Sequence, residues 1–283
     1  MREDKVRKPC VAGTFYPAHP EMLRESIEGF LARVELPSLQ GEIVGGVCPH
    51  AGYVYSGQAQ AYVYRALQDR DFTTAVIIAS SHSAYYAGAS IYPEGCYQTP
   101  LGEVKIDSEL AEELLSSPHF QFMPQAHLRE HSVEVQLPFL QVIKENFSFL
   151  PIVISEFTEE MAKEMAESIY RATRKKNVIF IASSDLSHYP PYHIAGKVDR
   201  ETINRILSLD PSGLHEFAVY APRRYPGVST AICGEGAVLT LLYLLPLIGG
   251  NRAQLLVYYN SGDVMEGMQR EVVGYSGIIF LKG

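Results

Sequence analysis

The chain has 283 residues, of which 47% are hydrophobic and 20% are charged, a composition typical of a globular protein. Its 24 Lys and Arg residues against 32 Asp and Glu residues give a formal net charge of −8, which argues against a protein that binds nucleic acid by neutralising phosphates. The four cysteines form no C-x-x-C pair, so a zinc ribbon or an iron–sulfur cluster is not expected. No apolar run reaches the roughly 20 residues of a membrane span, and the N-terminal stretch lacks the apolar region of a secretory signal. We expect one cytoplasmic domain over 1–283, without a nucleic-acid or membrane partner.

The predicted elements alternate between helices and short apolar strands. A helix is expected first, over 20–34, because its apolar residues recur at helical spacing. Continuous apolar runs then predict strands buried on both faces at 43–48, 75–79, 149–154, 178–182, 255–259 and 277–281. Helical patterns cover 58–67, 108–115, 133–146, 158–174, 198–207 and 234–245. The alternation predicts an α/β fold: a three-layer sandwich with a central mixed or mostly parallel sheet and helices on both faces.

Polar side chains follow three of the predicted strands directly. His50 comes after the first strand, His82 after the second, and Asp185 and His188 after the fourth. Ligands of open α/β sheets bind beyond the carboxyl ends of the strands. If these three strands are parallel neighbours, the four side chains therefore lie on the rim of one cleft.

Neutral imidazoles are common ligands of transition metals, and two of them with one anionic donor leave positions open for substrate and O₂. The anionic donor could be Asp185, one of Glu130 and Glu134, or Cys233. Cys233 directly precedes a strongly apolar helix, whose positive dipole end favours a thiolate. The alternative is that Cys233 packs as a small buried hydrophobic residue.

A second polar cluster lies in the segment Glu130-His131-Ser132-Val133-Glu134. His131 and Glu134 would share one helix face, a spacing found in carboxylate metal sites and equally in an ordinary helix cap. The tyrosines that flank candidate histidines, and that could line a pocket for an aromatic group, are Tyr53, Tyr55, Tyr189 and Tyr192. The histidines expected to have only surface or loop roles are His19, His119, His127, His193 and His215.

Segments spread along almost the whole chain resemble the Memo family, whose microbial members are called AmmeMemoRadiSam system protein B. The segments that carry the resemblance are 7–17, 49–57, 81–82, 99–102, 130–140, 183–189, 233–234, 261–263 and 273–275. The resemblance implies a fold similar to the LigB-type class III extradiol dioxygenases, which are non-haem Fe(II) enzymes.

Site roles follow from the same resemblance. His50 and His82 would be the two histidine ligands, and Cys233 would stand where the ring-cleaving enzymes use a glutamate. His188 would match their acid/base histidine, with Asp185 beside it. A thiolate is softer than a carboxylate and shifts the metal preference towards Zn(II), Cu(I) or a more covalent iron site, which does not favour catechol cleavage.

The sequence therefore points first to a metal-dependent, dioxygenase-like redox enzyme, with Fe(II) as the expected ion and Cu or Zn as the others. His188 and Asp185 would carry the proton chemistry. The residues expected to support the site or to contact the substrate are Glu130, His131, Tyr53 and Tyr189.

Two alternatives use the same pocket. One is a module that binds a small molecule or a phosphotyrosine peptide without turnover. The other is a zinc hydrolase that uses His50, His82 and Asp185 with a metal-bound water as nucleophile. The family's microbial members are associated with an AMMECR1-like protein and a radical-SAM protein, which the resemblance implies as partners.

Overall fold

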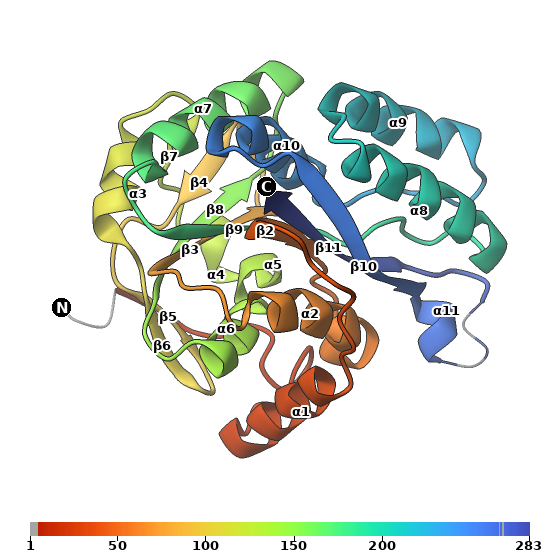
Figure 1. Cartoon of the computed structure of the whole chain (residues 1–283), viewed down its shortest axis with the longest axis horizontal. Helices are drawn as coiled ribbons and strands as arrows, with labels where there is room; N and C mark the ends of the chain where they lie inside the picture. Colours follow the sequence, from red (N-terminus) through yellow and green to blue (C-terminus); the bar gives the residue numbers. More distant parts are fainter. Residues whose placement is uncertain (1–4, 266, 268) are drawn as a thin grey trace.

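The computed structural model describes residues 5–265, 267 and 269–283 and shows an eight-stranded mixed sheet between two layers of helices (Figure 1). The strand order is β10-β11-β2-β9-β3-β8-β4-β7. The strands of this sheet are β2 (Glu42–Cys48), β3 (Thr74–Ser80), β4 (Ala89–Ile91), β7 (Phe120–Gln121), β8 (Ser148–Ile154), β9 (Val178–Ser183), β10 (Arg252–Asn260) and β11 (Gly274–Lys282). The predicted three-layer α/β architecture is confirmed.

The centre of the sheet is parallel and its margins are antiparallel. Strands β2, β9, β3 and β8 run side by side in one direction, whereas β11 pairs antiparallel with both β2 and β10. All six residues of β9 are buried, which explains why this strand has an unbroken apolar run instead of an alternating pattern. The parallel centre matters for function because it brings the carboxyl ends of β2, β9 and β3 to one edge.

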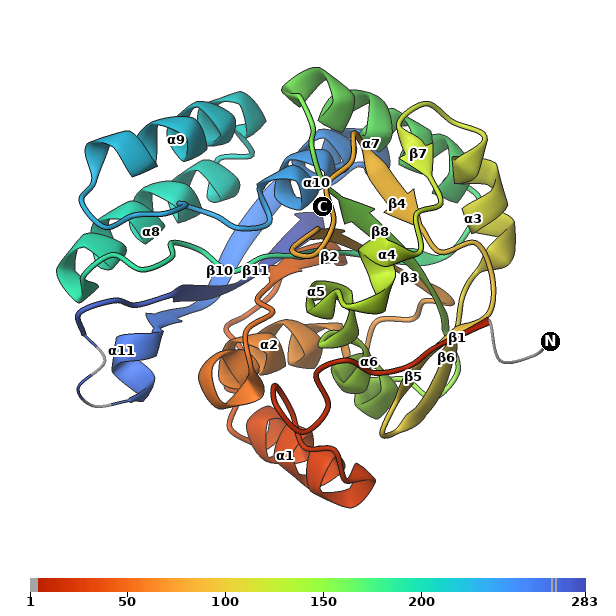
Figure 2. The same ribbon diagram turned by 180° about the vertical axis from the view of Figure 1, so that it is seen from behind.

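The helices divide between the two faces (Figure 2). Their bounds are α1 (Pro20–Ala32), α2 (Tyr53–Leu67), α3 (Ser108–Leu115), α4 (Gln125–Leu128), α5 (His131–Glu134), α6 (Leu137–Ile143), α7 (Glu159–Thr173), α8 (Tyr192–Leu207), α9 (Pro211–Arg224), α10 (Glu235–Ile248) and α11 (Ser261–Val264). Helix α2 packs on β2 and β11 on one face, while α10 packs on β3, β9 and α7 on the other. Within the described residues no helix is long and apolar enough to cross a membrane.

Two sequence expectations need correction. The helix expected over 133–146 is two short helices, α5 and α6, because Pro138 lies in the first turn of α6 and its ring does not fit a helix interior. Helix α9 was not expected at all. A second, three-stranded sheet also forms from β1 (Val6–Arg7), β5 (Cys96–Thr99) and β6 (Gly102–Lys105). This small sheet brings the N-terminal segment next to α4 and α5.

Candidate metal centre

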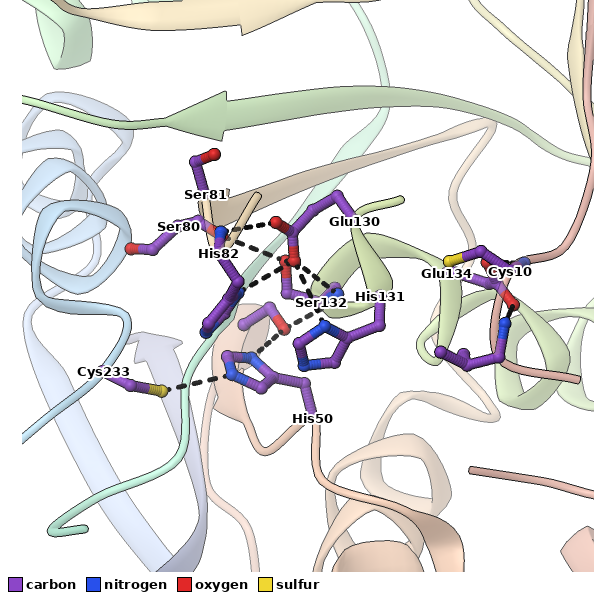
Figure 3. Close-up of polar contacts among 12 residues, drawn as sticks. Cys10, His50, Ser80, Ser81, His82, Glu130, His131, Ser132, Glu134 and Cys233 are labelled. Atoms are coloured by element: carbon purple, nitrogen blue, oxygen red, sulfur yellow. Dashed lines mark hydrogen bonds and ion pairs between the residues drawn. The ribbon is translucent and has the colours of Figure 1, made fainter. Parts of the chain in front are cut away.

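The carboxyl ends of three neighbouring strands form the candidate site. Strand β9 lies between β2 and β3 and is parallel to both. Figure 3 shows that His50, which follows β2, and His82, which follows β3, point their rings toward one another. The ring centroids of these two histidines lie 5.1 Å apart. Asp185 follows β9 and reaches the same place, so the expectation of a shared rim is met.

His50 is buried, with 2% of its surface exposed, and its tautomer is fixed by a chain of hydrogen bonds. The Ser183 hydroxyl donates to the carbonyl oxygen of Ser132 at 2.7 Å, so it must accept from Nδ1–H of His50 at 3.0 Å. The Nε2 atom of His50 therefore carries a free lone pair. Burial, and then the nearby His131 and His82, hold the pKa of His50 well below its usual value. The ring is neutral at pH 7 and offers Nε2 as a ligand atom.

Glu130 organises the histidines on one side of His50, which we call the imidazole side (His82, His131 and Glu130). The Glu130 carboxylate accepts from Nδ1 of His82 at 2.9 Å and from the His82 backbone N–H at 2.6 Å. Burial opposes ionisation of Glu130, but its bonds to His82 outweigh that cost and lower its pKa to about 2. Burial likewise opposes protonation of His82, but Glu130 outweighs it and raises the pKa of this imidazole. With Nδ1 committed to Glu130, the Nε2 atom of His82 remains available.

Cys233 and Asp185 occupy the other side of His50, the sulfur side. The Sγ atom of Cys233 lies 3.2 Å from Nε2 of His50 and accepts from the Asp185 backbone N–H at 3.2 Å. The Asp185 carboxylate in turn accepts from the His50 backbone N–H at 2.8 Å. Burial, and then the charge of Asp185, raise the pKa of the Cys233 thiol well above its usual value. Burial therefore opposes the thiolate that the helix dipole is expected to favour.

In the part of the chain that the structure describes, two groups of donor atoms are close enough to hold one ion, and both include His50. One group is His50, His82 and His131, and the other is His50, Asp185 and Cys233; within each group the donor atoms lie within 4.8 Å of one another. The ligand set expected from the sequence, His50 with His82 and Cys233, takes members from both groups. His131, which was expected near the substrate, lies with its ring centroid 4.6 Å from that of His82.

Glu134 does not belong to either group. Its carboxylate forms a fully buried ion pair with Arg7 and accepts from the backbone N–H of Cys10 at 2.8 Å. Figure 3 shows Glu134 on the far side of its helix from the His131 ring. The suggestion that His131 and Glu134 share a metal-binding face is therefore wrong. Arg7 also donates to the carbonyl oxygen of Glu130 at 2.6 Å, so this pair fixes the segment that carries the imidazole side.

Comparisons with known proteins identify the family of this chain. A family model described as Memo-like protein matches residues 7–279. The chain belongs to the Memo family. A MEMO1 family protein of Desulfurococcus amylolyticus is 39% identical over 292 residues, covering 98% of this chain and 99% of that protein. A MEMO1 family protein of Methanosarcina barkeri is 39% identical over 277 residues, covering 97% and 99%.

One solved structure is also similar to this Memo-family chain. It is the crystal structure of the uncharacterized protein JW3007 from Escherichia coli K12, with a TM-score of 0.47 and 15% sequence identity. The match covers 76% of this chain and 90% of that protein.

Asp185 and His188 of the Memo-family chain lie beside the candidate ligands. Asp185 is buried, and burial raises the pKa of its carboxyl, although the charge of His188 works in the opposite direction. The Nδ1 atom of His188 lies 3.0 Å from the carbonyl oxygen of Leu186. Because a carbonyl only accepts, Nδ1 carries the proton and Nε2 of His188 has the free lone pair. The two side chains expected to move protons are thus a carboxyl with raised proton affinity and a half-buried imidazole.

The four predicted tyrosines take different places, and Tyr55 is half-buried, with its carbonyl oxygen accepting from the Tyr259 hydroxyl at 2.9 Å. Tyr53 is only 2% exposed and donates its hydroxyl hydrogen to the carbonyl oxygen of Val135, so it supports the core under the site. Tyr189 is 53% exposed, and its ring meets that of His188 edge-on at 5.5 Å. Tyr192 donates to Asp263 in α11. Among the predicted tyrosines, Tyr189 therefore has an exposed ring in contact with a predicted catalytic residue.

The structure adds features that the sequence did not reveal. A cavity of about 240 Å³ adjoins Cys233. Its lining is Ser80, Ser81, Tyr85, Ile154, Ser155, Glu156, Phe157, Thr230, Ile232, Cys233, Glu235 and Gly236. Ser183, which accepts from His50, and Gln136, which donates to Ser183, were given no role in the site, although segments 183–189 and 130–140 contain them. His127 is not a surface residue: it is buried between Tyr97 and Ser90, and burial lowers its pKa to about 3.

Proposed function

We propose that this Memo-family protein is a metal-dependent, dioxygenase-like oxidoreductase whose ion is held by His50, His82 and Cys233. The observation that supports this most is the tautomer of His50. Its Nδ1–H is committed to Ser183, and its neutral ring points the Nε2 lone pair toward both the imidazole side and the sulfur side. An imidazole held in this way can bind a cation through the Nε2 lone pair without first losing a proton.

The donor set fits a transition metal. His82 donates its Nδ1–H to the carboxylate of Glu130, the arrangement that orients histidine ligands and raises their basicity in many metal sites. Cys233 adds a sulfur 3.2 Å from the free nitrogen of His50. Two imidazoles and a thiolate suit iron, copper or zinc better than calcium or magnesium, which prefer oxygen ligands. A bound Fe(II) or Cu ion would supply the electrons for a reaction with O₂ or another oxidant.

The residues next to the proposed metal ligands would position the substrate and accept its protons. His188 has a free Nε2 atom that can accept a proton from a bound ligand, because Nδ1 is committed to Leu186. Asp185 holds the turn after β2 through the backbone N–H of His50 and so keeps the His50 ring in place. The cavity next to Cys233 has space for a small molecule, and Tyr85 and Phe157 give it aromatic surface.

The phosphopeptide alternative is less well supported by the electrostatics. A phosphate in this cleft would face the ionised carboxylate of Glu130 and the buried Asp185, while His50 stays neutral. The charges around the cleft therefore favour a cation over a dianion.

The test is metal analysis of protein purified and reconstituted under anaerobic conditions. We expect about one iron or copper ion per chain, and loss of the ion in His50→Ala and His82→Ala. His193→Ala, at an exposed histidine on α8, is the matched control and should retain it. Equal metal content in all four proteins would contradict the proposal. Retention of metal by Cys233→Ser, with loss in Asp185→Ala, would favour the zinc hydrolase instead.

A further inference from the structure

A second large cavity lies at the opposite edge of the sheet from the metal centre. It has a volume of about 640 Å³, within the range of small-molecule sites. Strands β2 and β9 begin there, β11 ends there, and helices α7 and α10 end beside it. Nothing in the proposed chemistry of the histidine cluster uses this cavity.

The wall of this cavity is strongly cationic. Its positive side chains are Arg70, Arg174, Lys175, Lys176 and Lys282, and its one carboxylate is Glu42. The protein as a whole has a net charge of −8, so this concentration of positive charge contrasts with the rest of the chain. Arginine and lysine side chains gathered in one pocket are the usual means of recognising phosphate groups.

Three of these cations have no acidic partner. Arg70 pairs with Glu42, and Lys176 pairs with carboxylates outside the cavity. Within residues 5–265, 267 and 269–283, no carboxylate forms an ion pair with the other three cations, Arg174, Lys175 and Lys282. Their charges remain available to a ligand.

A structural role for these cations would be to neutralise the negative ends of α7 and α10. The last turns of both helices, however, are already capped by backbone N–H groups. The Lys176 N–H donates to the carbonyl oxygen of Thr173 at 2.8 Å, and the Gly250 N–H donates to that of Leu245 at 2.8 Å. Backbone N–H groups therefore already cap carbonyls at both helix ends, and the side chains of Arg174, Lys175 and Lys282 line the cavity.

The other part of the lining is apolar. Val44, Val178 and Phe180 come from the sheet and are buried, whereas Leu247 and Ile248 at the end of α10 keep exposed surface. A purely inorganic anion would leave Leu247 and Ile248 in contact with water. A ligand that combines several negative charges with an apolar or aromatic group would use both surfaces.

We propose that this cavity is a second ligand site, which binds a phosphate-bearing organic polyanion such as a nucleoside triphosphate. Arg174, Lys175 and Lys282 contact the phosphates, and the end of α10 contacts the organic group. The site is independent of the metal centre, so the binding of metal and the binding of the polyanion can be tested separately.

The probe is ATP in metal-free, low-salt buffer, with the heat of binding measured by calorimetry. We expect saturable binding that weakens as salt is added. The triple variant Arg174→Gln/Lys175→Gln/Lys282→Gln should weaken it by roughly 30-fold, because each lost charge contact weakens binding a fewfold. The triple variant Lys105→Gln/Lys163→Gln/Lys197→Gln removes the same charge from exposed positions outside the cavity and should bind like the wild type.

Three results would overturn the proposal. These are the absence of saturable ATP binding by the wild type at low salt, equal affinities for the two triple variants, and loss of binding in His82→Ala, which would place ATP at the metal centre. Inorganic tripolyphosphate should bind at least roughly tenfold more weakly than ATP, since it leaves the apolar surface of the cavity uncovered. Equal affinities for tripolyphosphate and ATP would refute the proposal that the cavity also contacts an organic group. If the cavity variant does not fold by circular dichroism, Lys175→Gln alone, at an exposed residue, gives the same comparison with a smaller, fewfold effect.

Discussion

The imidazole side and the sulfur side of His50 are built in different ways. On the imidazole side, ionised Glu130 accepts two hydrogen bonds from His82, and its pKa is lowered to about 2. On the sulfur side, burial raises the pKa of the Asp185 carboxyl and, well above its usual value, that of the Cys233 thiol. A cation bound by the Cys233 sulfur therefore has to displace the thiol proton, whereas Glu130 on the imidazole side already accepts hydrogen bonds as a carboxylate. Metal binding should accordingly release protons.

The largest expected effect comes from removing the support of the imidazole side. Arg7→Ala leaves Glu134 buried without its ion pair and removes the donors to the carbonyl oxygens of Glu130 and His127. Breaking a buried pair in this way typically costs about 3–5 kcal/mol of unfolding free energy. Urea unfolding should show that loss, and the exposed neighbour Lys8→Ala should change stability by less than about 0.5 kcal/mol. If Arg7→Ala lowers the unfolding free energy by less than about 1 kcal/mol, the Arg7–Glu134 ion pair does not stabilise the segment that carries Glu130 and His131.

The next effect concerns the ligands of the imidazole side directly. Glu130→Gln keeps the shape of the side chain but removes the charge that orients His82. Loss of such a partner typically weakens metal binding by about 10–100-fold, which a competition assay with a chelator can measure. Glu156→Gln changes the same charge at an exposed residue that lines the small cavity and should leave the affinity unchanged. Equal metal affinities for Glu130→Gln and Glu156→Gln would mean that the charge of Glu130 does not prepare the imidazole side for a metal ion.

The smallest effect tests the loop that supports the sulfur side. Asp199 is buried, accepts from the backbone N–H of Ser187 at 2.9 Å and from the hydroxyl of Tyr258 at 2.8 Å, and burial raises its pKa to about 6. The folded protein therefore binds this proton more tightly than the unfolded chain. The stabilisation is present at low pH and is lost as the pH rises through about 6.

Asp199→Asn removes this dependence. The difference in unfolding free energy between the wild type and Asp199→Asn should shift by about 2 kcal/mol between pH 4.5 and pH 7, with the wild type losing stability relative to the variant. Urea unfolding at the two pH values measures this shift. A difference that stays constant with pH would mean that Asp199 titrates as it does in the unfolded chain.

The sequence was sufficient to predict the buried strands of a mixed or mostly parallel sheet and the edge at which His50, His82 and Asp185 gather. The apolar runs of β2, β3 and β9 are unbroken because these strands are covered on both faces, and His50, His82 and Asp185 follow them directly. The role of Arg7 was not predictable, since its partner Glu134 is more than a hundred positions away and only the small β1-β5-β6 sheet brings the two together.

Two further features of the site could not be predicted from the sequence, and each has a local cause. The pattern of 133–146 is helical throughout, and periodicity does not reveal the break that Pro138 makes between α5 and α6. His131 and Glu134 both lie in α5, and Glu134 points away from His131 to Arg7 and Cys10, which are distant in the sequence. The thiol of Cys233 was expected to be acidic from its place at a helix N-terminus. Burial beside Asp185 outweighs the dipole, and burial cannot be seen in a single sequence.

The most direct test of the metal centre is an X-ray absorption spectrum of the anaerobic, iron-loaded protein. If one ion takes ligands from both sides of His50, the spectrum contains imidazole nitrogens together with one sulfur, and the sulfur contribution disappears in Cys233→Ser. A spectrum without sulfur in the wild type, whose nitrogen contribution falls in His131→Ala, would contradict this account and assign the ion to the three imidazoles alone.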